Sequence, residues 1–366
     1  MLASRSLRPR IALVTSGIGT KHGGIGVVAQ LIVSALNEHS DLVVWEHHAF
    51  WPRFARIPAA VVTALLGSIK TPDLVVYDHV DLAVLHAVIP RLKSVPYAVF
   101  LHGIEVWKPL VGRRREALLG ANLLLVNSAT TETEARVFNP WLPKVAVTWL
   151  GVARQNEIAN VGSNPPVGLI VGRMADSERL KGHDAVMDAW PLIRSMAPDA
   201  KLMIVGEGND KRRLEKRVKT EQLEGIEFFG RISDTERNRM YRSCRLLFYP
   251  SKQEGFGLAG VEAASFGLPV LGLAGTVTDE LFPTGTGAVM ANDLSKESIA
   301  ESAVPLLTTA QHAAELGRAA LARVNAFFLE EHFIDRFRLA VAPLLLSCKS
   351  PEAIQASSSS RQSSSR

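Results

Sequence analysis

Short apolar runs alternate with helix-length segments along most of the chain. Runs of this length that are rich in Val, Leu and Ile predict buried strands. The strands expected in the first half are Arg10–Thr15, Asp41–Trp45, Leu74–Tyr77, Tyr97–Leu101, Leu123–Val126 and Val145–Trp149. Those expected in the second half are Val167–Val171, Leu202–Val205, Ile226–Phe229, Leu246–Tyr249, Val270–Leu273 and Ala288–Met290. Strands separated by helices predict parallel α/β layers.

The helical segments carry their own signals. Apolar residues recur at steps of three and four from Ile25 to Leu36, which predicts one amphipathic helix between the first two strands. Ser233 and Glu236 have the spacing of a capping box. Residues 295–346 are expected to be helical, with Ser295 as the N-cap.

A stretch rich in Gly, Asn and Pro, from Gly151 to Pro166, interrupts the pattern and predicts a linker. We therefore expect an N-terminal Rossmann-like domain over 1–152, a linker over 153–165 and a second Rossmann-like domain over 166–325. A C-terminal helix over 326–346 is expected to pack back towards the first domain, before a disordered Ser-rich tail over 347–366. The 366 residues fit two such α/β domains. Two domains facing a central cleft are typical of an enzyme that opens and closes.

Composition narrows the class of protein. The two cysteines, Cys244 and Cys348, exclude a disulfide scaffold and fit a reducing compartment. The longest mostly apolar run, Ile57–Ile69, has 13 residues, whereas a membrane span needs about 20. The first apolar stretch, Ile11–Val14, is too short for a signal peptide. We expect a cytoplasmic protein, and docking on the inner face of the cell membrane stays open.

The charge is uneven along the chain. Residues 1–150 hold 15 Lys and Arg against 10 Asp and Glu, and residues 151–366 hold 26 of each kind. The whole net charge of +5 therefore lies in the first half, which favours anionic partners there.

Two features of the first half could bind a ligand. A glycine-rich turn from Ser16 to Gly26 follows the first strand, and Gly23 and Gly24 open the next helix, where backbone N–H groups can approach a phosphate. It is not the dinucleotide fingerprint, because His22 stands where the third glycine belongs. His102 follows another strand and is expected at the carboxyl edge of the sheet. The alternatives are a flexible loop and a structural histidine.

Arg173 and Lys181 flank one loop of the second half, after a strand and before a helix. The planar fork of an arginine and the compact charge of a lysine together suit a diphosphate. The alternative is a pair of solvated surface cations.

The most specific segment runs from Glu254 to Glu262. Glu254 is expected in a turn, and the glycines after it let the chain enter a helix whose first N–H groups, over Phe256–Leu258, lack partners within the helix. Eight helical residues place the two carboxylates about 12 Å apart, beyond the roughly 5–9.5 Å of a glycosidase pair. We therefore expect them to contact separate parts of one long ligand; the alternative is two unrelated surface carboxylates.

Taken together, these residues resemble the retaining glycosyltransferases of family 4, which have the GT-B fold. The resemblance covers roughly residues 10–345 and is most specific in the E-x7-E segment and in Val171-Gly-Arg through Lys-Gly-His-Asp184. Gly23-Gly24, His102-Gly103 and Val126-Asn-Ser-Ala-Thr130 support it.

The resemblance implies transfer of a hexosyl group from a nucleotide diphosphate sugar to a sugar, glycan or lipid-linked acceptor, in polysaccharide or glycoconjugate biosynthesis. The donor-binding residues it implies are Gly23, Gly24, Arg173, Lys181, Glu254, Gly255, Phe256, Gly257, Leu258 and Glu262. Among them Glu262 is expected at the ribose, Arg173 and Lys181 at the diphosphate, and Glu254 at the transferred sugar. The catalytic set is Glu254, Arg173 and Lys181, with His102 contacting the sugar from the first domain, which faces the acceptor. The family needs neither metal nor cofactor beyond the donor, and the chain lacks a D-x-D triplet.

Three other functions remain open from the residues alone. A nucleotide-sugar epimerase has the same fold, although the paired cations and carboxylates argue against it. A nicotinamide-dependent oxidoreductase would use Glu46 as the ribose acid, but the broken glycine triplet disfavours it. A membrane or nucleic-acid binder would rest on the basic first half alone, without an RNA-binding motif.

Overall fold

The structure is a computed structural model that describes residues 8–19, 23–46 and 71–347. It divides into two compact units, one of residues 1–150 with 331–366 and the other of residues 151–330. The apolar run Ile57–Ile69 and the Ser-rich tail beyond residue 347 lie outside the described residues. Each unit is described by itself.

The first unit is built on a parallel sheet of six strands in the order β2-β1-β3-β4-β5-β6. Its strands are β1 (Arg10–Thr15), β2 (Asp41–Glu46), β3 (Leu74–Tyr77), β4 (Tyr97–Leu101), β5 (Leu123–Val126) and β6 (Val145–Val147). Both β3 and β4 are buried along their whole length, as parallel strands covered on both faces must be.

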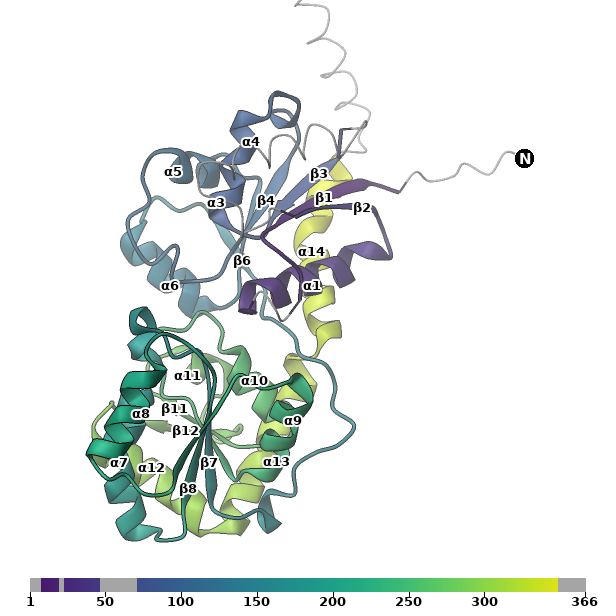
Figure 1. Ribbon diagram of the computed structural model, residues 1–366. Coiled ribbons are helices and arrows are strands. Elements are labelled where there is room, and N and C mark those ends of the chain that lie inside the picture. Colours follow the sequence, from purple (N-terminus) through teal and green to yellow (C-terminus); the bar gives the residue numbers. More distant parts are fainter. Residues whose placement is uncertain (1–7, 20–22, 47–70, 348–366) are drawn as a thin grey trace, which may run out of the picture. The chain divides into compact units, whose positions relative to one another are not determined.

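Helices cover both faces of this sheet. Figure 1 shows α1 (Gly23–Asn37) and α14 (Glu330–Ser347) on one face, with α3 (Val80–Ala83), α5 (Gly112–Leu119) and α6 (Ala129–Phe138) on the other. The short helices α4 (Leu85–Val88) and η2 (Pro90–Leu92) lead into β4. The C-terminal helix is tied to α1, because the guanidinium of Arg338 donates to the carbonyl of Ala35 at 2.7 Å.

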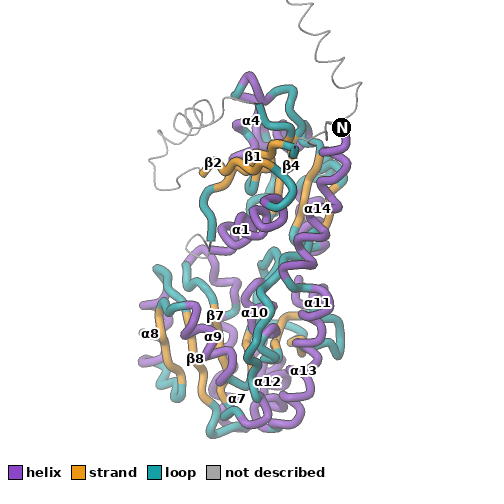
Figure 2. Tube along the Cα trace, turned by 90° about the vertical axis from the view of Figure 1, so that its right-hand side faces the viewer, coloured by secondary structure: helices purple, strands orange, loops and turns teal. Residues whose placement is uncertain are grey.

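The second unit has a parallel sheet in the order β12-β11-β10-β7-β8-β9. Its strands are β7 (Val167–Val171), β8 (Lys201–Val205), β9 (Ile226–Gly230), β10 (Leu246–Phe248), β11 (Val270–Leu273) and β12 (Ala288–Ala291). Its helices are η3 (Val161–Ser163), η4 (Asp176–Lys181), α7 (His183–Met196), α8 (Lys211–Thr220), α9 (Asp234–Ser243), α10 (Leu258–Ser265), α11 (Val277–Leu281), α12 (Lys296–Thr308) and α13 (Ala310–Phe327). Helices α7, α8 and α12 lie on one side of the sheet, and α9, α10 and α13 lie on the other (Figures 1 and 2).

The predicted parallel α/β fold class is confirmed, with some changes at element ends. The last strand of the first sheet stops at Val147 instead of Trp149. The predicted helical region divides into three helices at Thr309 and Phe328, and Ser295 is its N-cap as expected. The stretch expected as a linker packs within the second unit, since the Ala159 amide donates to the carbonyl of Phe266 at 2.7 Å. Among the described residues, no helix has the length and apolar character needed to cross a membrane.

Candidate active site

The strand order of the second unit reverses at β7. The next strand along the chain, β8, lies on one side of β7, and β10 lies on the other. Loops that leave the carboxyl ends of two strands at such a point diverge, and ligands of open α/β sheets bind there. Arg173 follows β7, and Glu254 lies in the loop after β10. The topology therefore brings these two predicted residues to the same edge.

Backbone contact with a neighbouring loop fixes the position of Arg173. The Met174 amide donates to the carbonyl of Glu207 at 2.9 Å. On either side, Gly206 and Gly208 have positive φ, and a Cβ on either would come within 1.9 Å of a carbonyl oxygen, that of Gly172 or Met174. Only glycine permits this close approach. The segment that carries Arg173 is thus held rigidly against the loop after β8.

Four charged side chains converge at this edge. The ammonium of Lys181 lies 3.1 Å from a carboxylate oxygen of Glu178 and 4.0 Å from one of Glu254. The guanidinium of Arg173 forms an ion pair with the other oxygen of Glu178. Three predicted residues are therefore brought together. Glu178 was not predicted; the available signal was its position as a carboxylate between the two cations in the same loop.

The turn after β10 presents Glu254 and the start of α10. Gly257 is the N-cap of this helix and has φ of 85°, a left-handed conformation that favours glycine. A Cβ on Gly257 would lie 3.1 Å from the ring of Tyr249, so the turn packs closely on that ring. Burial and the neighbouring Glu254 carboxylate, which shares a hydrogen bond with the phenol, hold the pKa of Tyr249 well above its usual range. Gly255 and Phe256 are buried, and Leu258 is half-buried at the first turn of the helix.

Glu262 has a different set of partners from Glu254. It lies on α10, where the phenol of Tyr241 donates to it at 3.3 Å and the guanidinium of Arg237 lies 3.6 Å away. Burial raises the pKa of its carboxyl, and Arg237 opposes that rise. Neither Tyr241 nor Arg237 was predicted, because both come from α9 and only the tertiary packing places them beside α10.

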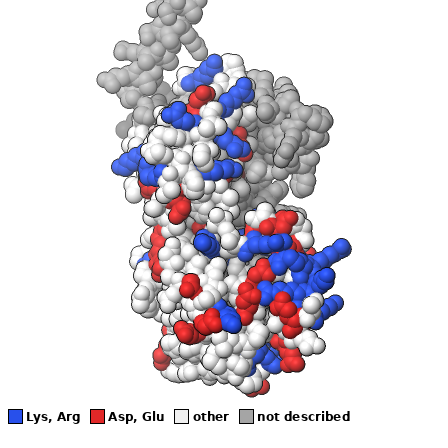
Figure 3. Space-filling model, turned by 90° about the vertical axis from the view of Figure 1, so that its left-hand side faces the viewer, with Lys and Arg blue, Asp and Glu red and all other residues white. Residues whose placement is uncertain are grey.

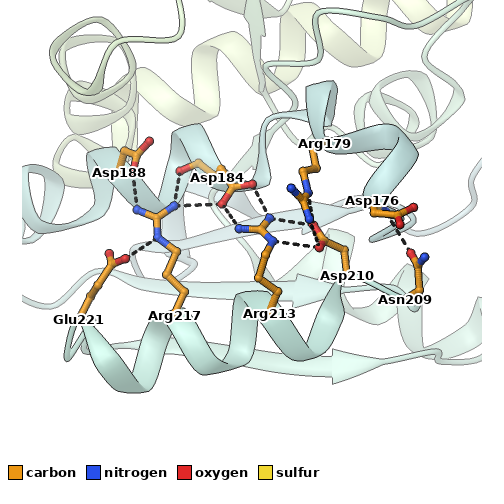
Figure 4. Close-up of polar contacts among 9 residues, drawn as sticks. All are labelled: Asp176, Arg179, Asp184, Asp188, Asn209, Asp210, Arg213, Arg217 and Glu221. Atoms are coloured by element: carbon orange, nitrogen blue, oxygen red, sulfur yellow. Dashed lines mark hydrogen bonds and ion pairs between the residues drawn. The ribbon is translucent and has the colours of Figure 1, made fainter.

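Asp184, which ends the Lys-Gly-His-Asp motif, does not point to this cluster. It binds the guanidinium groups of Arg213 and Arg217 on α8, and Arg213 also binds Asp210 (Figure 4). Arg179, from the loop of Glu178, donates to the same Asp210. The network therefore links helices α7 and η4 to α8. Figure 3 shows basic and acidic side chains mixed over the second unit, in keeping with such pairing.

The first unit has a reversal point of its own, between β1 and β3. Thr15 ends β1 and donates from its hydroxyl to the buried carboxylate of Asp78, which follows β3. The ring of His102, at the end of β4, contacts the carbonyl of Asp78. Burial raises the pKa of Asp78 to about 7, and burial lowers the pKa of His102. His102 thus lies at the expected carboxyl edge; Asp78 was not predicted as part of it.

Gly23 and Gly24 form the exposed start of α1, next to the end of β1. Gly23 has φ of 68°, which favours glycine, and open space surrounds the position of a Cβ. Within the described ranges, no group of three or more His, Cys, Asp and Glu side chains is arranged to hold a metal ion.

Comparison with known proteins identifies the family to which the second unit is similar. Residues 153–323 match the family model described as glycosyl transferases group 1. The second unit thus carries a domain of this glycosyltransferase family. A GDP-mannose-dependent mannosyltransferase of Corynebacterium glutamicum, acting on a monoacylated phosphatidylinositol monomannoside, is 28% identical over 154 residues, which are 40% of this chain and 40% of that protein. The chain's match thus spans well under half of that relative.

Solved structures extend the likeness in fold to both units of the chain. HepE of Anabaena in complex with UDP and glucose matches with a TM-score of 0.71 and 17% identity, over 91% of this chain and 99% of that one. Sucrose-phosphate synthase of Thermosynechococcus elongatus matches with a TM-score of 0.76 and 17% identity, over 93% and 100%. At this identity the likeness establishes the GT-B-like fold, with its two parallel six-stranded sheets, and no more.

Proposed function

We propose that the chain is a retaining hexosyltransferase that uses a nucleotide diphosphate sugar. The observation that carries the proposal is the convergence of Arg173, Lys181 and Glu254 where the strand order reverses, within a group 1 glycosyltransferase unit. A nucleotide-sugar epimerase would bind the same diphosphate, and sugar transfer to an acceptor is the activity that separates it from the proposed enzyme.

Charge development explains the need for the two cations. Transfer breaks the bond between the anomeric carbon of the sugar and the diphosphate oxygen, so negative charge grows on the phosphate. Arg173 and Lys181, already fixed at one place, stabilise that charge without reorganising. Glu254 and the first amides of α10 hold the hydroxyls of the transferred sugar, and Glu262 holds the ribose. His102, Gly23 and Gly24 contribute from the first unit.

The acceptor hydroxyl then attacks the anomeric carbon on the face from which the diphosphate departs, and its proton passes to a leaving phosphate oxygen. This route retains the configuration and requires no nucleophile from the protein. We further propose that the first unit receives the acceptor, and that this acceptor is a glycan or is linked to a lipid. The phosphatidylinositol mannoside in the name of the Corynebacterium relative supports a lipid-linked acceptor.

A donor screen tests the proposal. Thermal unfolding is recorded with UDP-, GDP- and ADP-sugars, because a ligand that binds the native state raises stability by RT ln(1 + [L]/Kd). One class of donor is expected to raise the melting temperature, and the same donor is expected to be hydrolysed slowly or transferred to glycan acceptors. Absence of any shift and of any sugar release with all three classes would contradict the proposed function.

A further inference from the structure

Glu178 lies between two of the proposed donor-binding residues, but no role in donor binding has been given to it so far. Its carboxylate pairs with Arg173 through one oxygen and with Lys181, at 3.1 Å, through the other. The Glu178 side chain is only 13% exposed, whereas that of Arg173 is 67% exposed and that of Lys181 is 24% exposed. The carboxylate is thus the most buried of these three charged side chains.

We propose that Glu178 is a positioning residue, which holds Arg173 and Lys181 together so that both charges meet one diphosphate. This inference rests on the proposed function. Two neighbouring cations repel each other, and a carboxylate between them offsets that repulsion. A largely exposed arginine also samples many rotamers, and pairing it beforehand removes part of the entropy that binding otherwise loses.

The local backbone is shaped for this contact. Helix η4 is interrupted at Glu178 itself, where φ of −126° and ψ of 26° depart from helical values. On both sides the loop is anchored elsewhere: the amide of Asp176 donates to Asn209 at 3.0 Å, and Arg179 binds Asp210. The kink therefore separates Glu178 from these anchors and turns it to Arg173 and Lys181.

Nucleotide titration with matched variants tests the proposal. Binding of UDP, GDP, UMP and GMP is measured by calorimetry for the wild type, Glu178→Gln and the control Asp176→Asn. The control removes the same charge from an exposed position in the same turn. We expect Glu178→Gln to raise the Kd of the preferred diphosphate about tenfold, the scale on which supporting partners act on ligand-binding groups. The Kd of Glu178→Gln for the matching monophosphate, which lacks the second phosphate on which the cations are proposed to act, is expected to change less than about twofold. The Kd of Asp176→Asn for the diphosphate is also expected to change less than about twofold.

A merely structural role gives a different result. Equal losses for the diphosphate and monophosphate would show that Glu178 only maintains the loop and would overturn the inference, as would tighter diphosphate binding by Glu178→Gln. In the Arg173→Ala background, the further loss from Glu178→Gln is expected to shrink below about threefold, since one cation remains to be positioned. Glu178→Asp, which keeps the charge on a shorter side chain, provides the same comparison if the glutamine variant does not fold.

The test separates the two proposals. A wild type that binds a diphosphate while Glu178→Gln binds it equally well contradicts the positioning role alone. A wild type that binds none of the four nucleotides contradicts the proposed function and the positioning role together.

Discussion

Arg173 and Lys181 are the residues on which the proposed chemistry depends most directly. Removing either by substitution with alanine takes away one of two groups that stabilise charge on the leaving diphosphate. We expect each substitution to lower kcat by roughly two to three orders of magnitude, the scale reported for loss of one such donor. Steady-state kinetics check this, with the exposed neighbour Lys252→Ala as the control. Near-normal rates in a folded Arg173→Ala or Lys181→Ala variant would contradict the assignment.

Glu254 and Glu262 are expected to fail in different ways, because their partners differ. Glu262 lies among Tyr241 and Arg237, whereas Glu254 lies beside Lys181 and Tyr249. We expect Glu262→Ala to weaken binding of the free nucleoside diphosphate about tenfold through loss of charged hydrogen bonds to the ribose. Glu254→Ala is expected to leave that binding unchanged and to lower sugar transfer. Calorimetry and a transfer assay measure both, and equal losses of nucleotide affinity would rule out the divided roles.

Asp78 predicts a pH dependence of stability. Its pKa is raised from 3.8 to about 7 by burial, so between these values the native state binds a proton that the unfolded state does not. The contribution of this group to the free energy of unfolding is therefore greatest at low pH and falls as pH rises from about 4 to about 7. On going from pH 5 to pH 8, we expect the free energy of unfolding of Asp78→Asn to rise by about 2 kcal/mol relative to that of the wild type. Urea unfolding at both pH values measures the gain, and the same difference at both would show that Asp78 does not titrate between pH 5 and pH 8 in the folded state.

At the residue scale, the sequence predicted the members of the cluster that belong to a spaced motif. Arg173, Lys181 and Glu254 each follow a strand or precede a helix, so their edge could be inferred before the structure. Tyr241 and Arg237 could not be inferred, because a helix two elements away brings them to Glu262. Glu178 lies within the motif, yet its orientation depends on a backbone kink that no residue type specifies.

At the scale of elements, strands were predicted more accurately than connections. Four strands of the first sheet have the predicted bounds, because continuous Val and Leu runs flanked by polar residues mark both ends of a buried strand. The short helices α3 and α4 were not predicted, since four residues hold too little periodicity. The Gly, Asn and Pro content of residues 153–165 predicts a linker. Its hydrogen bond to Phe266 is a tertiary contact that composition does not reveal.

The joint between α7 and α8 gives a prediction at this scale. Arg213 binds Asp184 and the buried Asp210, and its hydrogen bonds hold the pKa of Asp210 well below the usual range. We expect Arg213→Met to destabilise the second unit by about 2 kcal/mol at pH 7, a value reduced for the partial exposure of the arginine. A carboxyl group whose pKa is lowered in the folded state stabilises that state at pH values above its unfolded pKa, and this stabilisation is lost as pH falls. The difference in unfolding free energy between the wild type and Arg213→Met is therefore expected to narrow below pH 4.

Urea unfolding at pH 7 and pH 3.5 measures this dependence, with Arg212→Met as the control. Arg212 is the exposed neighbour on the same helix, and the described residues offer it no acidic partner. A loss that is equal for both variants, or that is as large at pH 3.5 as at pH 7, would contradict a role for the ion pairs.

At the scale of the whole molecule, the structure shows which of the unevenly distributed basic side chains are paired and which are exposed. In the second unit three of the six basic residues of α8 pair with carboxylates, namely Lys211, Arg213 and Arg217. The excess positive charge of the first half includes Arg113, Arg114 and Arg115 on α5. Arg114 pairs with Asp81, and Arg115 lies over the ring of Trp141 at 5.1 Å. Arg113 is exposed, and Val111 beside it is 76% exposed.

We predict that the first unit docks reversibly on anionic membranes through this end of α5. The alternative is that these arginines are solvated surface charges. Arg53 and Arg56, with the aromatic residues Phe50, Trp51 and Phe54 of the same basic half, lie outside the described residues. Each Lys or Arg near an anionic surface contributes about 1 kcal/mol, and the attraction is screened within about 10 Å at 0.1 M salt.

Co-sedimentation with liposomes that contain anionic lipid, at low and high salt, measures the docking. Binding is expected at low salt and is expected to fall steeply when Arg113, Arg114 and Arg115 are replaced by Ser. The matched control replaces Arg212, Lys216 and Lys219 by Ser, which removes three exposed charges from α8 of the second unit. Because an attraction spread over the whole chain would respond to either triple change, equal losses would reject a defined docking surface. Absence of binding at low salt would leave a soluble acceptor as the better assignment.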